Sequence, residues 1–597
     1  MTVPAEQPQA GYGIGLLIDA VSRWAERIST QVAVRAPDGT LTWGELTEST
    51  RAIARALDAA GVGPQTPVGL FSGRSRLSLP SLLAVWWLGA TAVLADERHP
   101  AERLYSVLRD AGAQTVVAGP VPAGALPSGT RVISADASSA DASSAADPAM
   151  AAPGPVVAGP DDCAYIVYTS GTTGWPKGVE VTYSNLGTFL GALAGLNLPA
   201  GGMGINAVSP AFDGWLNCAL LYMLHGQGMA VVDLAARDGA AGLSELVEAH
   251  SPRTVCLTPT LLSALERLPA AELIVVAGEP CPPTLAARLA GTPRVLNIYG
   301  PTEATIAATW ADSARGDDPA TIGRPLPGYR VYILDSERQP VAPGVVGELY
   351  IGGPAVARGY RNRPDLTSER FSLDPFAADG TRMYRSGDLA RFRPDGQIEY
   401  RGRADEQIKV RGFRVELGEI EQVALTIGTV RAAAAFKTAG GDSLGLAVTT
   451  TPGTDAGECV AQIRERCAAR LPDFMVPGTV EVIAALPTLP TGKVDRATLA
   501  RTAGATAVER PPSTERERQV CEAWSELLSR PVNDVQANFF ELGGHSLLAA
   551  RAVGVLRRST GLPLSVRHLL DAPTAAALAR ELDRLARIER ERLWRAR

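Results

Sequence analysis

The sequence has few of the residues that build metal centres and disulfide frameworks. Its 597 residues include only five histidines and seven cysteines, with no Cys-x-x-Cys pair, no HExxH motif and no His-x₃-His pair. An odd number of scattered cysteines indicates reduced thiols, and a structural zinc site needs closely spaced ligand pairs. We therefore expect a cytoplasmic protein with no disulfide framework and no histidine-built metal centre.

The sequence also lacks a signal peptide, a membrane-spanning segment and an excess of basic residues. The N-terminal stretch MTVPAEQPQA has no basic segment followed by an apolar one. The longest apolar run, SLLAVWWLGATAVLA, is shorter than the roughly 20 residues of a membrane-spanning helix, so we interpret it as a buried helix followed by a buried strand. The net charge of -6 provides no basic field. We expect small molecules or proteins as partners, but no nucleic acid and no membrane.

The overall composition is that of a globular protein with several domains. Hydrophobic residues make up 46% of the chain and charged residues 20%, and the length suggests about three or four domains. Up to about Pro120, helical patterns such as LTWGELTESTRAIARALDAAG, which ends at Gly61, alternate with short apolar strands such as PVGLF. This alternation predicts an α/β architecture with parallel strands.

Changes of pattern along the chain predict where its domains divide. An ADASS duplication marks a low-complexity loop, a hairpin pattern followed by a helix begins after Arg403, and the pattern from about Ser513 is wholly helical. We predict a large α/β domain over residues 1–404 with a loop near 134–155, a small α+β domain over 405–500, a linker over 501–512, a helical bundle over 513–585 and a charged helical tail over 586–597.

A loop of glycines and hydroxyl residues, YTSGTTGWPKGVEV, follows the apolar stretch CAYIVY. Such a loop can direct backbone N–H groups, hydroxyls and an ammonium group at phosphate oxygens. It is not a Walker A loop, because Pro176 precedes Lys177 and Gly178 follows it. The composition alone leaves open the alternative of a solvated turn.

The sequence resembles the adenylation domains of nonribosomal peptide synthetases, which belong to the adenylate-forming enzymes. The resemblance covers roughly residues 12 to 500. Beyond the loop above, it is carried by seven stretches that follow the order of the family's core motifs: LTWGEL, NIYGPTEA, GELYIGGPAVARGYRNRPDLTSERF, YRSGDLARF, GRADEQIKVRGFRVELGEIE, LPDFMVP and LPTGKVDRATL. It implies a large N-terminal subdomain, a small mobile α+β subdomain, and a reaction that joins a carboxylate to the α-phosphate of ATP.

The same resemblance implies the residues of the ATP site. These are Thr169, Ser170, Gly171, Thr172, Thr173, Gly174, Lys177, Asn297, Tyr299, Asp388 and Arg403. Tyr299 would stack on adenine, Asp388 would accept from the ribose hydroxyls and Arg403 would donate to the ribose–phosphate region. The alternatives are a core aromatic for Tyr299, and a turn cap or a surface ion pair for Asp388 and Arg403.

Three further residues receive roles from the resemblance. Lys493 matches the family's mobile catalytic lysine, Glu303 the carboxylate associated with Mg²⁺, and Asp405 the hinge about which the small subdomain turns. The alternatives are an exposed lysine in a Pro/Gly turn for Lys493, a residue in the first turn of a helix for Glu303 and an ordinary β-turn aspartate for Asp405.

Asp213, in SPAFDGWLNCALLY, matches the aspartate that pairs with the α-ammonium group of an amino acid; its alternative is a helix N-cap. The resemblance places the remaining pocket positions at Gly214, Asn217, Cys256, Val275, Ala277, Ile298, Ile306 and Ala307. None of them is charged, and burying a charged side chain without a partner is expensive. We therefore expect a neutral substrate of medium to aromatic size, with Asn217 and Cys256 either touching one polar atom or only packing.

Trp86 and Trp87 depart from the usual sequence of the family, which has fewer aromatic residues at these positions. In relatives this region can contact a small MbtH-like activator protein. The two tryptophans are either core residues or part of such a surface.

The C-terminal helical segment contains FFELGGHSLLA, in which Ser546 follows His545. A hydrolase elbow needs G-x-S-x-G between a strand and a helix, and GHSLL lacks the second glycine. The segment instead resembles a four-helix peptidyl carrier domain, which implies that 4′-phosphopantetheine is attached to Ser546. A helix N-cap role for this serine is compatible with that attachment.

Together these features predict a free-standing adenylation–carrier didomain that uses ATP, Mg²⁺ and 4′-phosphopantetheine. It would form an aminoacyl-adenylate and then a thioester on its own carrier domain. The expected protein partners are a phosphopantetheinyl transferase, an MbtH-like protein, and condensation or tailoring enzymes acting in trans. The alternatives are an acyl- or aryl-acid ligase that uses free coenzyme A and a carrier scaffold without catalytic activity.

Overall fold

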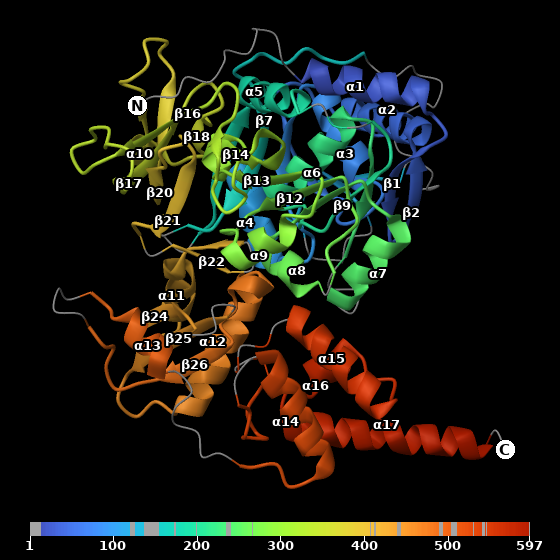
Figure 1. Cartoon of the computed structure of the whole chain (residues 1–597), viewed down its shortest axis with the longest axis vertical. Helices are drawn as coiled ribbons and strands as arrows, with labels where there is room; N and C mark the ends of the chain where they lie inside the picture. Colours follow the sequence, from blue (N-terminus) through green and yellow to red (C-terminus); the bar gives the residue numbers. More distant parts are fainter. Residues whose placement is uncertain are drawn as a thin grey trace. The chain divides into compact units, whose positions relative to one another are not determined.

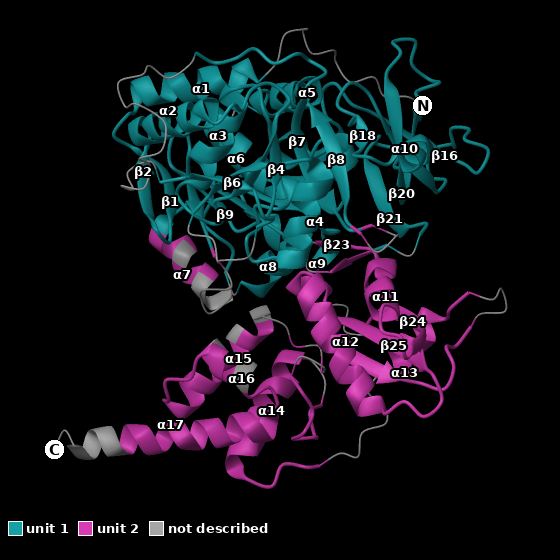
Figure 2. Ribbon diagram, turned by 180° about the vertical axis from the view of Figure 1, so that it is seen from behind, with its two compact units in different colours: residues 1–170, 176–232, 250–407 teal, residues 171–175, 233–249, 408–597 magenta. Residues whose placement is uncertain are grey.

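The computed structural model describes most of the chain and divides it into two compact units (Figures 1 and 2). The described residues are 14–119, 126–136, 154–171, 175–196, 198, 200–233, 240–265, 267–405, 407–410, 413–438, 443–488, 493–502, 510–528, 531–539, 542, 544 and 546–595. The first unit comprises residues 1–170, 176–232 and 250–407, and the second 171–175, 233–249 and 408–597. The low-complexity loop predicted near 134–155 lies mostly outside the described residues, and the predicted domain boundaries stay predictions.

A seven-stranded sheet of the first unit has the order β18-β8-β7-β4-β3-β5-β6. Its strands are β3 (Pro67–Phe71), β4 (Thr91–Leu94), β5 (Thr115–Ala118), β6 (Arg131–Ser134), β7 (Cys163–Thr169), β8 (Lys177–Thr182) and β18 (Gly359–Tyr360). Strands β3 to β7 run parallel, and β8 and β18 are antiparallel additions at one edge. Helices α3 (Ser78–Trp87) and α4 (Ala101–Ala111) connect strands of this sheet, α2 (Trp43–Ala59) leads into β3, and α5 (Tyr183–Ala194) follows β8. The predicted α/β architecture with parallel strands is confirmed.

Local sequence explains how these helices begin. Thr42 accepts a hydrogen bond from the N–H of Glu45, whose carboxylate accepts from the N–H of Thr42, and this capping box starts α2. The apolar run before Asp96 forms α3 and β4, as predicted. Trp86 is completely buried and its indole N–H donates to the carbonyl of Ala164 at 2.9 Å, whereas Trp87 is partly buried. Trp86 is therefore a core residue and not part of a docking surface.

A nine-stranded sheet of the same unit has the order β15-β14-β13-β12-β11-β9-β10-β1-β2. Its strands are β1 (Val32–Ala36), β2 (Gly39–Thr42), β9 (Met203–Asn206), β10 (Gly228–Val231), β11 (Thr254–Leu257), β12 (Leu273–Ala277), β13 (Val295–Tyr299), β14 (Thr309–Asp312) and β15 (Arg324–Pro325). The central strands are parallel. Helices α1 (Gly15–Arg27), α6 (Asp213–Leu224), α8 (Pro259–Ala264) and α9 (Pro283–Leu289) accompany this sheet.

A smaller antiparallel sheet completes the first unit. It contains β16 (Arg330–Leu334), β17 (Gly347–Gly352), β19 (Phe371–Leu373), β20 (Arg382–Phe392) and β21 (Ile398–Arg403), and α10 (Pro364–Arg370) precedes β19. One hydrophobic cluster includes Val68, Met229 and Leu349, one residue from each of the three sheets. The sheets therefore share a continuous core, which fixes the strand ends that carry the polar residues described below.

The second unit contains a small α+β fold. Its elements are β22 (Ile408–Val410), β23 (Phe413–Val415), α11 (Leu417–Leu425), β24 (Val430–Lys437), β25 (Leu444–Thr450), α12 (Ala456–Arg470), β26 (Thr479–Val482) and α13 (Arg496–Thr502). Strands β22 and β23 form the predicted hairpin, and α11 follows directly. Ile420, Ile463 and Leu446 belong to its own buried cluster, which identifies this segment as a separately packed body.

The C-terminal part of the second unit is helical, as predicted. It consists of α14 (Glu515–Leu528), α15 (Ser546–Thr560), α16 (Val566–Asp571) and α17 (Ala575–Arg595). Trp524 and Phe539, with ring centroids 4.9 Å apart, lie at the centre of its core. Helix α7 (Ala240–His250) has residues in the same unit.

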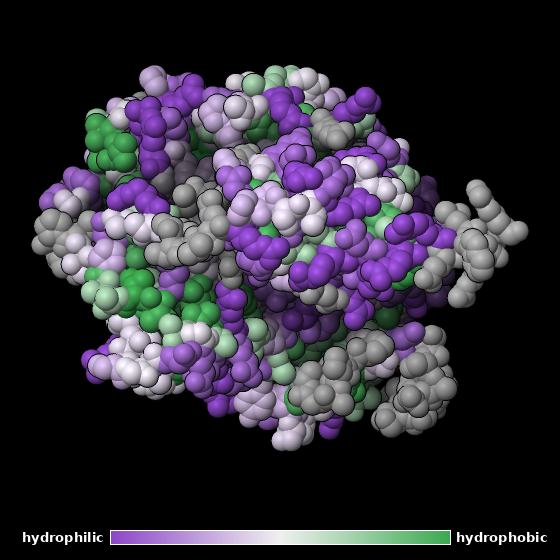
Figure 3. Space-filling model, turned by 90° about the horizontal axis from the view of Figure 1, so that it is seen from below, coloured by the Kyte–Doolittle hydropathy of each residue, from purple (hydrophilic) through white to green (hydrophobic). Residues whose placement is uncertain are grey.

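Hydrophilic residues cover most of the face shown in Figure 3, and hydrophobic residues gather there in separate groups. Within the described segments, no helix combines the length and the apolar character needed to cross a membrane.

Candidate active site

Glu303, Tyr360 and Lys177 form a buried polar cluster in the first unit. Glu303 lies in the short 3₁₀ turn Thr302–Ala304 after β13, Lys177 begins β8 and Tyr360 ends β18. The hydroxyl of Tyr360 donates to Oε1 of Glu303 at 2.6 Å, and Nζ of Lys177 lies 3.7 Å from the same oxygen. The ammonium also lies 4.6 Å from the centroid of the Tyr360 ring. Glu303 is 0% exposed, so this carboxylate is a buried charge beside a cation and not a solvated first-turn residue.

The donor set in this cluster fits a magnesium ion that is shared with a nucleotide. Mg²⁺ in phosphate-binding sites is held by one or two carboxylates, and substrate phosphates and water complete its octahedron. Glu303 supplies one carboxylate, and no group of three or more His, Cys, Asp or Glu side chains that could cage a metal occurs among the described residues. A metal at Glu303 would therefore depend on phosphate oxygens for its remaining ligands.

The glycine- and hydroxyl-rich loop begins at the end of β7. Thr169 and Ser170 are buried, and Oγ1 of Thr169 has no hydrogen-bond partner among the described residues. An unsatisfied buried hydroxyl is costly, and a phosphate oxygen would satisfy it. The N–H of Gly171 donates to Oε2 of Glu419 at 3.2 Å within the second unit. Thr172, Thr173 and Gly174 lie outside the described residues.

A second polar group connects the strands β13, β20 and β21. Asp388 on β20 is paired in register with Arg403 on β21, and Oδ1 of Asp388 accepts from Nη1 of Arg403 at 2.7 Å. The other carboxylate oxygen accepts from the hydroxyl of Tyr299 at the end of β13. Burial, and then the carboxylate of Asp388, raise the pKa of Tyr299 well above its usual range. Tyr299 therefore stays a neutral donor. Asp388 and Arg403 form a buried ion pair and not a surface one.

Arg403 also binds Asp405, the predicted hinge residue. Its Nε and Nη2 donate to the two carboxylate oxygens at 2.6 and 2.7 Å. This bidentate contact joins the hinge position to the Asp388–Arg403 pair. Tyr299 is 8% exposed and belongs to the main core cluster, so the core alternative holds for this residue and its stacking on adenine stays a prediction.

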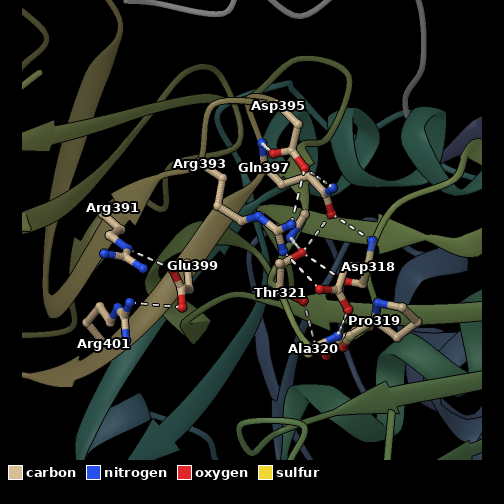
Figure 4. A network of polar contacts seen from close by, with 12 residues as sticks. Asp318, Pro319, Ala320, Thr321, Arg391, Arg393, Asp395, Gln397, Glu399 and Arg401 are labelled. Carbon is tan, nitrogen blue, oxygen red and sulfur yellow. Dashed lines mark hydrogen bonds and ion pairs between the residues drawn. The ribbon is translucent and has the colours of Figure 1, made fainter. Parts of the chain in front are cut away.

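A polar network holds this strand pair against the neighbouring sheet (Figure 4). Gln397, in the turn between β20 and β21, accepts through Oε1 from the N–H of Asp318 and the hydroxyl of Thr321. Arg393 donates to Asp318 at 2.9 Å. Asn297 on β13 donates to the carbonyls of Pro319 and Thr321. Asn297 thus supports the loop that carries the network, and its predicted contact with ATP stays a prediction.

Asp213 is the first residue of α6, and Phe212 is the N-cap. The N-cap alternative for Asp213 is therefore wrong. Its Oδ2 is buried and has no hydrogen-bond partner among the described residues. Burial raises its pKa to about 6, a hydrogen bond with Thr302 opposes this rise and the nearby Glu303 adds to it. A buried carboxylate with an unsatisfied oxygen is an unfavourable arrangement that an ammonium group would correct.

The other predicted pocket residues are brought together by strand register. Cys256 on β11 lies beside Val275 on β12, and Ala277 on β12 lies beside Ile298 on β13. Because Val275 and Ala277 are two residues apart, all four side chains lie on one face of the sheet. Helix α6, which carries Gly214 and Asn217, packs against the same sheet through hydrogen bonds to β9. Cys256 and burial together raise the pKa of the Cys218 thiol on α6 well above its usual range, and this proximity to Cys218 favours packing for Cys256.

Ile306 and Ala307 follow the turn that contains Glu303. Thr305 and Ile306 have φ of 54° and 73°, a left-handed conformation that non-glycine residues rarely adopt. The hydroxyl of Thr305 donates to the carbonyl of Ala355 at 2.6 Å, and the N–H of Ala357 donates to the carbonyl of Glu303 at 2.9 Å. These bonds hold the turn in its strained form beside the pocket face.

The remaining predicted residues lie in the second unit. Lys493 is exposed and precedes α13, and Ser546 is the first residue of α15. His545 lies outside the described residues. Tyr360 was assigned no role from the sequence, although it stands in the motif GGPAVARGYRNRPDLT. Its place depends on the pairing of β18 with β8, where Tyr360 lies opposite Val179, and the linear sequence does not show this pairing.

The site combines a hydroxyl-rich loop, a buried carboxylate beside a lysine and an unsatisfied carboxylate near an apolar sheet face. Residues 21–361 match the family model of the AMP-binding enzymes, and residues 518–582 match that of the phosphopantetheine attachment site. The chain belongs to the AMP-binding enzyme family and carries a C-terminal phosphopantetheine attachment domain. The predicted architecture of large subdomain, small α+β subdomain and four-helix carrier is confirmed.

The chain is similar to several proteins of natural-product biosynthesis. It is 39% identical over 556 residues to novobiocin biosynthesis protein H of Streptomyces niveus, which covers 90% of this chain and 91% of that protein. It is 36% identical to the dimodular nonribosomal peptide synthase of Bacillus subtilis (strain 168), where the match covers 95% of this chain but 24% of the longer protein. A solved structure of holo-PA1221, an NRPS protein containing adenylation and PCP domains, superposes with a TM-score of 0.76 at 25% identity, covering 95% of this chain and 96% of that one.

These relationships establish the class of reaction. The chain is an ATP-dependent adenylating ligase of the nonribosomal peptide synthetase type, with its carrier domain in the same chain. It uses ATP, Mg²⁺ and 4′-phosphopantetheine, and it forms an acyl-adenylate that is passed to the carrier as a thioester.

Proposed function

We propose that the enzyme activates a neutral α-amino acid of medium to aromatic size and loads it onto the phosphopantetheine arm of Ser546. The observation that carries this proposal is the buried, unsatisfied Oδ2 of Asp213 at the start of α6. An ammonium group beside it would satisfy the oxygen and lower the pKa of the carboxyl. An acid without an amino group would leave the carboxylate unsatisfied, which disfavours aryl and simple acyl acids.

The apolar wall supports a neutral side chain. Val275, Ile298 and Ile306 supply aliphatic surface, and Gly214, Ala277 and Ala307 leave room for a larger substrate group. Asn217 is the polar exception among these positions. Because one methylene is worth only about 1–3 kcal/mol in a hydrophobic pocket, we expect measurable activity with close analogues.

In the first half-reaction, a substrate carboxylate oxygen attacks the α-phosphorus of ATP, and the bond to the pyrophosphate leaving group breaks. Bound Mg²⁺ would neutralise phosphate charge, with Glu303 as its protein ligand. In this proposal Lys177 contacts phosphate, Asp388 and Arg403 hold the ribose region, and Lys493 reaches the carboxylate and α-phosphate. The positive charges of Lys177, Arg403 and Lys493 would reduce the repulsion between the carboxylate and the phosphates, which is the main barrier to their reaction.

In the second half-reaction, a phosphopantetheine arm held by this chain would supply the thiol that accepts the acyl group as AMP leaves. Ser546 would carry the arm after modification by a phosphopantetheinyl transferase, and attachment in the same chain raises the effective concentration of the thiol. Condensation or tailoring enzymes would accept the thioester in trans. The partly exposed Trp87 remains the candidate for contact with an MbtH-like protein, and ATP use with seven free, buried cysteines fits a cytoplasmic location.

Amino-acid-dependent pyrophosphate exchange tests the proposal. We expect exchange with neutral amino acids and little with their deaminated counterparts. Replacement Asp213→Asn should lower kcat/KM for the amino acid about 30-fold or more, the cost of breaking a buried charge pair, and should remove the preference over the deaminated acid. Lys493→Ala should abolish exchange, whereas Lys437→Ala, at the end of β24, should not. Exchange with a deaminated acid and with no amino acid, together with formation of an acyl-coenzyme A thioester and AMP when free coenzyme A is added, would instead establish the ligase alternative.

A further inference from the structure

Tyr360 occupies the centre of the Glu303–Lys177 cluster, and its role in the reaction is open. The side chain is 5% exposed. Its ring contacts Phe371 edge-on at a centroid distance of 5.4 Å and contacts the Lys177 ammonium at 4.6 Å. Its hydroxyl lies 2.6 Å from Oε1 of Glu303 and 3.4 Å from Nζ of Lys177. One residue therefore contacts both the anion and the cation of the cluster.

The distances show that the tyrosine, and not the lysine, makes the short contact with the carboxylate. The separation of 3.7 Å between Nζ of Lys177 and Oε1 of Glu303 is longer than a charge-assisted hydrogen bond, which is usually 2.7–2.9 Å. In a buried site, an unobstructed lysine–glutamate pair would gain Coulomb energy by closing this gap. The Tyr360 hydroxyl occupies the oxygen that a closed pair would use.

A neutral hydroxyl leaves both charges of the cluster in place. It orients the carboxylate by a hydrogen bond and does not cancel the negative charge, whereas a closed ion pair with Lys177 would neutralise both groups. Tyr360 meanwhile stabilises the ammonium through a cation–π contact with its ring and through its hydroxyl oxygen, which accepts from Nζ of Lys177 at 3.4 Å, so neither contact uses an oxygen of Glu303. The carboxylate keeps its charge for a metal, and the ammonium keeps its charge for a phosphate.

We propose that Tyr360 is a positioning residue that holds Glu303 by Oε1 and keeps Lys177 from closing onto it. The carboxylate is thereby set for Mg²⁺ and the ammonium for the phosphates of ATP. This inference rests on the proposed roles of Glu303 and Lys177.

Replacement Tyr360→Phe tests it, because phenylalanine retains the ring, the contact with Phe371 and the cation–π contact and removes only the hydroxyl. We expect the Mg²⁺ concentration for half-maximal pyrophosphate exchange to rise about tenfold or more, because the variant loses the short hydrogen bond to Glu303 and the longer one from Lys177. Calorimetric titration of the full chain with a non-hydrolysable ATP analogue and Mg²⁺ should show a similar loss of affinity. The KM for the amino acid should stay unchanged.

The matched control is Tyr332→Phe. The hydroxyl of Tyr332 donates to Oδ2 of the buried Asp374 at 2.9 Å, and this tyrosine–carboxylate bond lies on β16, outside the site. Both variants lose the same kind of bond, so a purely structural effect would change their thermal unfolding alike and leave the metal dependence of both unchanged.

A third variant separates failure of this inference from failure of the proposed function. If Glu303→Gln changes the Mg²⁺ dependence and Tyr360→Phe does not, the positioning role of Tyr360 is wrong. An unchanged Mg²⁺ dependence in both variants means that Glu303 does not hold the metal, and the inference fails together with that role. An equal shift of the Mg²⁺ dependence in Tyr332→Phe would also overturn the positioning role of Tyr360.

Discussion

Asp388 and Arg403 occupy directly opposed positions on the paired strands β20 and β21, and their side chains form an ion pair that is almost completely buried. Each charge has further partners, because Tyr299 donates to Asp388 and Arg403 donates to Asp405. The four side chains thus form one chain of polar contacts from the end of β13 to the hinge position.

We expect Arg403→Gln to raise the KM for ATP and to lower the free energy of unfolding. Removing one member of a buried pair leaves an uncompensated charge and typically costs about 3–5 kcal/mol. Denaturant unfolding and ATP titration of pyrophosphate exchange measure the two effects. The control is Arg385→Gln, which breaks the more exposed pair of Arg385 with Glu348 on the same sheet and should cost about 1 kcal/mol or less. Equal effects of the two substitutions would contradict a special role for Arg403.

The raised pKa of Asp213 predicts a pH dependence that is confined to the amino acid. With a pKa of about 6, the carboxyl becomes protonated in the free enzyme as the pH falls below 6 and can then no longer pair with an ammonium group. The KM for the amino acid should therefore rise below pH 6, while the KM for ATP should respond less. In Asp213→Asn the rise of KM below pH 6 should disappear. A rise that persists in this variant would assign the titration to another group.

The raised pKa of Asp213 also predicts how the stability of the substrate-free protein changes with pH. Its folded pKa is higher than the ordinary value of 3.8, so the folded state binds the proton more tightly than the unfolded state. Asp213 therefore destabilises the substrate-free protein above pH 6, and this penalty disappears as the pH falls from 6 towards 3.8. Asp213→Asn should stabilise the substrate-free protein at pH 8 by on the order of 1–3 kcal/mol, and by less at pH 5. Unfolding at the two pH values measures the difference.

Ser546→Ala should separate the two half-reactions. We expect pyrophosphate exchange to continue at the wild-type rate, because adenylation does not use the carrier thiol. Mass spectrometry after treatment with a phosphopantetheinyl transferase and coenzyme A should show no modification and no bound amino acid. Ser559→Ala, near the end of the same helix α15, should be modified normally. A modified Ser546→Ala protein would place the attachment site elsewhere.

Trp86 and Trp87 should differ in their effect on stability. Because Trp86 is completely buried and hydrogen-bonded to Ala164, Trp86→Ala should cost about 3–5 kcal/mol, as for other large-to-small core substitutions. Trp87 is only partly buried, so Trp87→Ala should cost less. Denaturant unfolding of both variants tests this, and equal costs would contradict the assignment of Trp86 to the core.

The ordered motifs pointed to residues that the structure brings close together, whereas the binding roles of these residues stay predictions. The family resemblance pointed to Cys256, Val275, Ala277 and Ile298 as neighbours, and the register of β11, β12 and β13 puts their side chains on one face of the sheet. The sequence could not show contacts between distant segments. Tyr360 reaches Glu303 and Lys177 only because β18 pairs with β8, and Asn297 meets Pro319 and Thr321 only after the sheet has formed.

The left-handed backbone at Thr305 and Ile306 has a consequence for altering substrate preference. Ile306, a proposed residue of the pocket wall, has a conformation that glycine adopts without strain and isoleucine adopts at a cost of about 1–3 kcal/mol. Replacing it with glycine would empty part of the wall and relax the main chain at the same time. A change of substrate selectivity after substitution of Ile306 would therefore reflect both the volume of the pocket and the mobility of the loop. Substitutions of Ile298, which lies on a regular strand, would change the volume of the pocket alone.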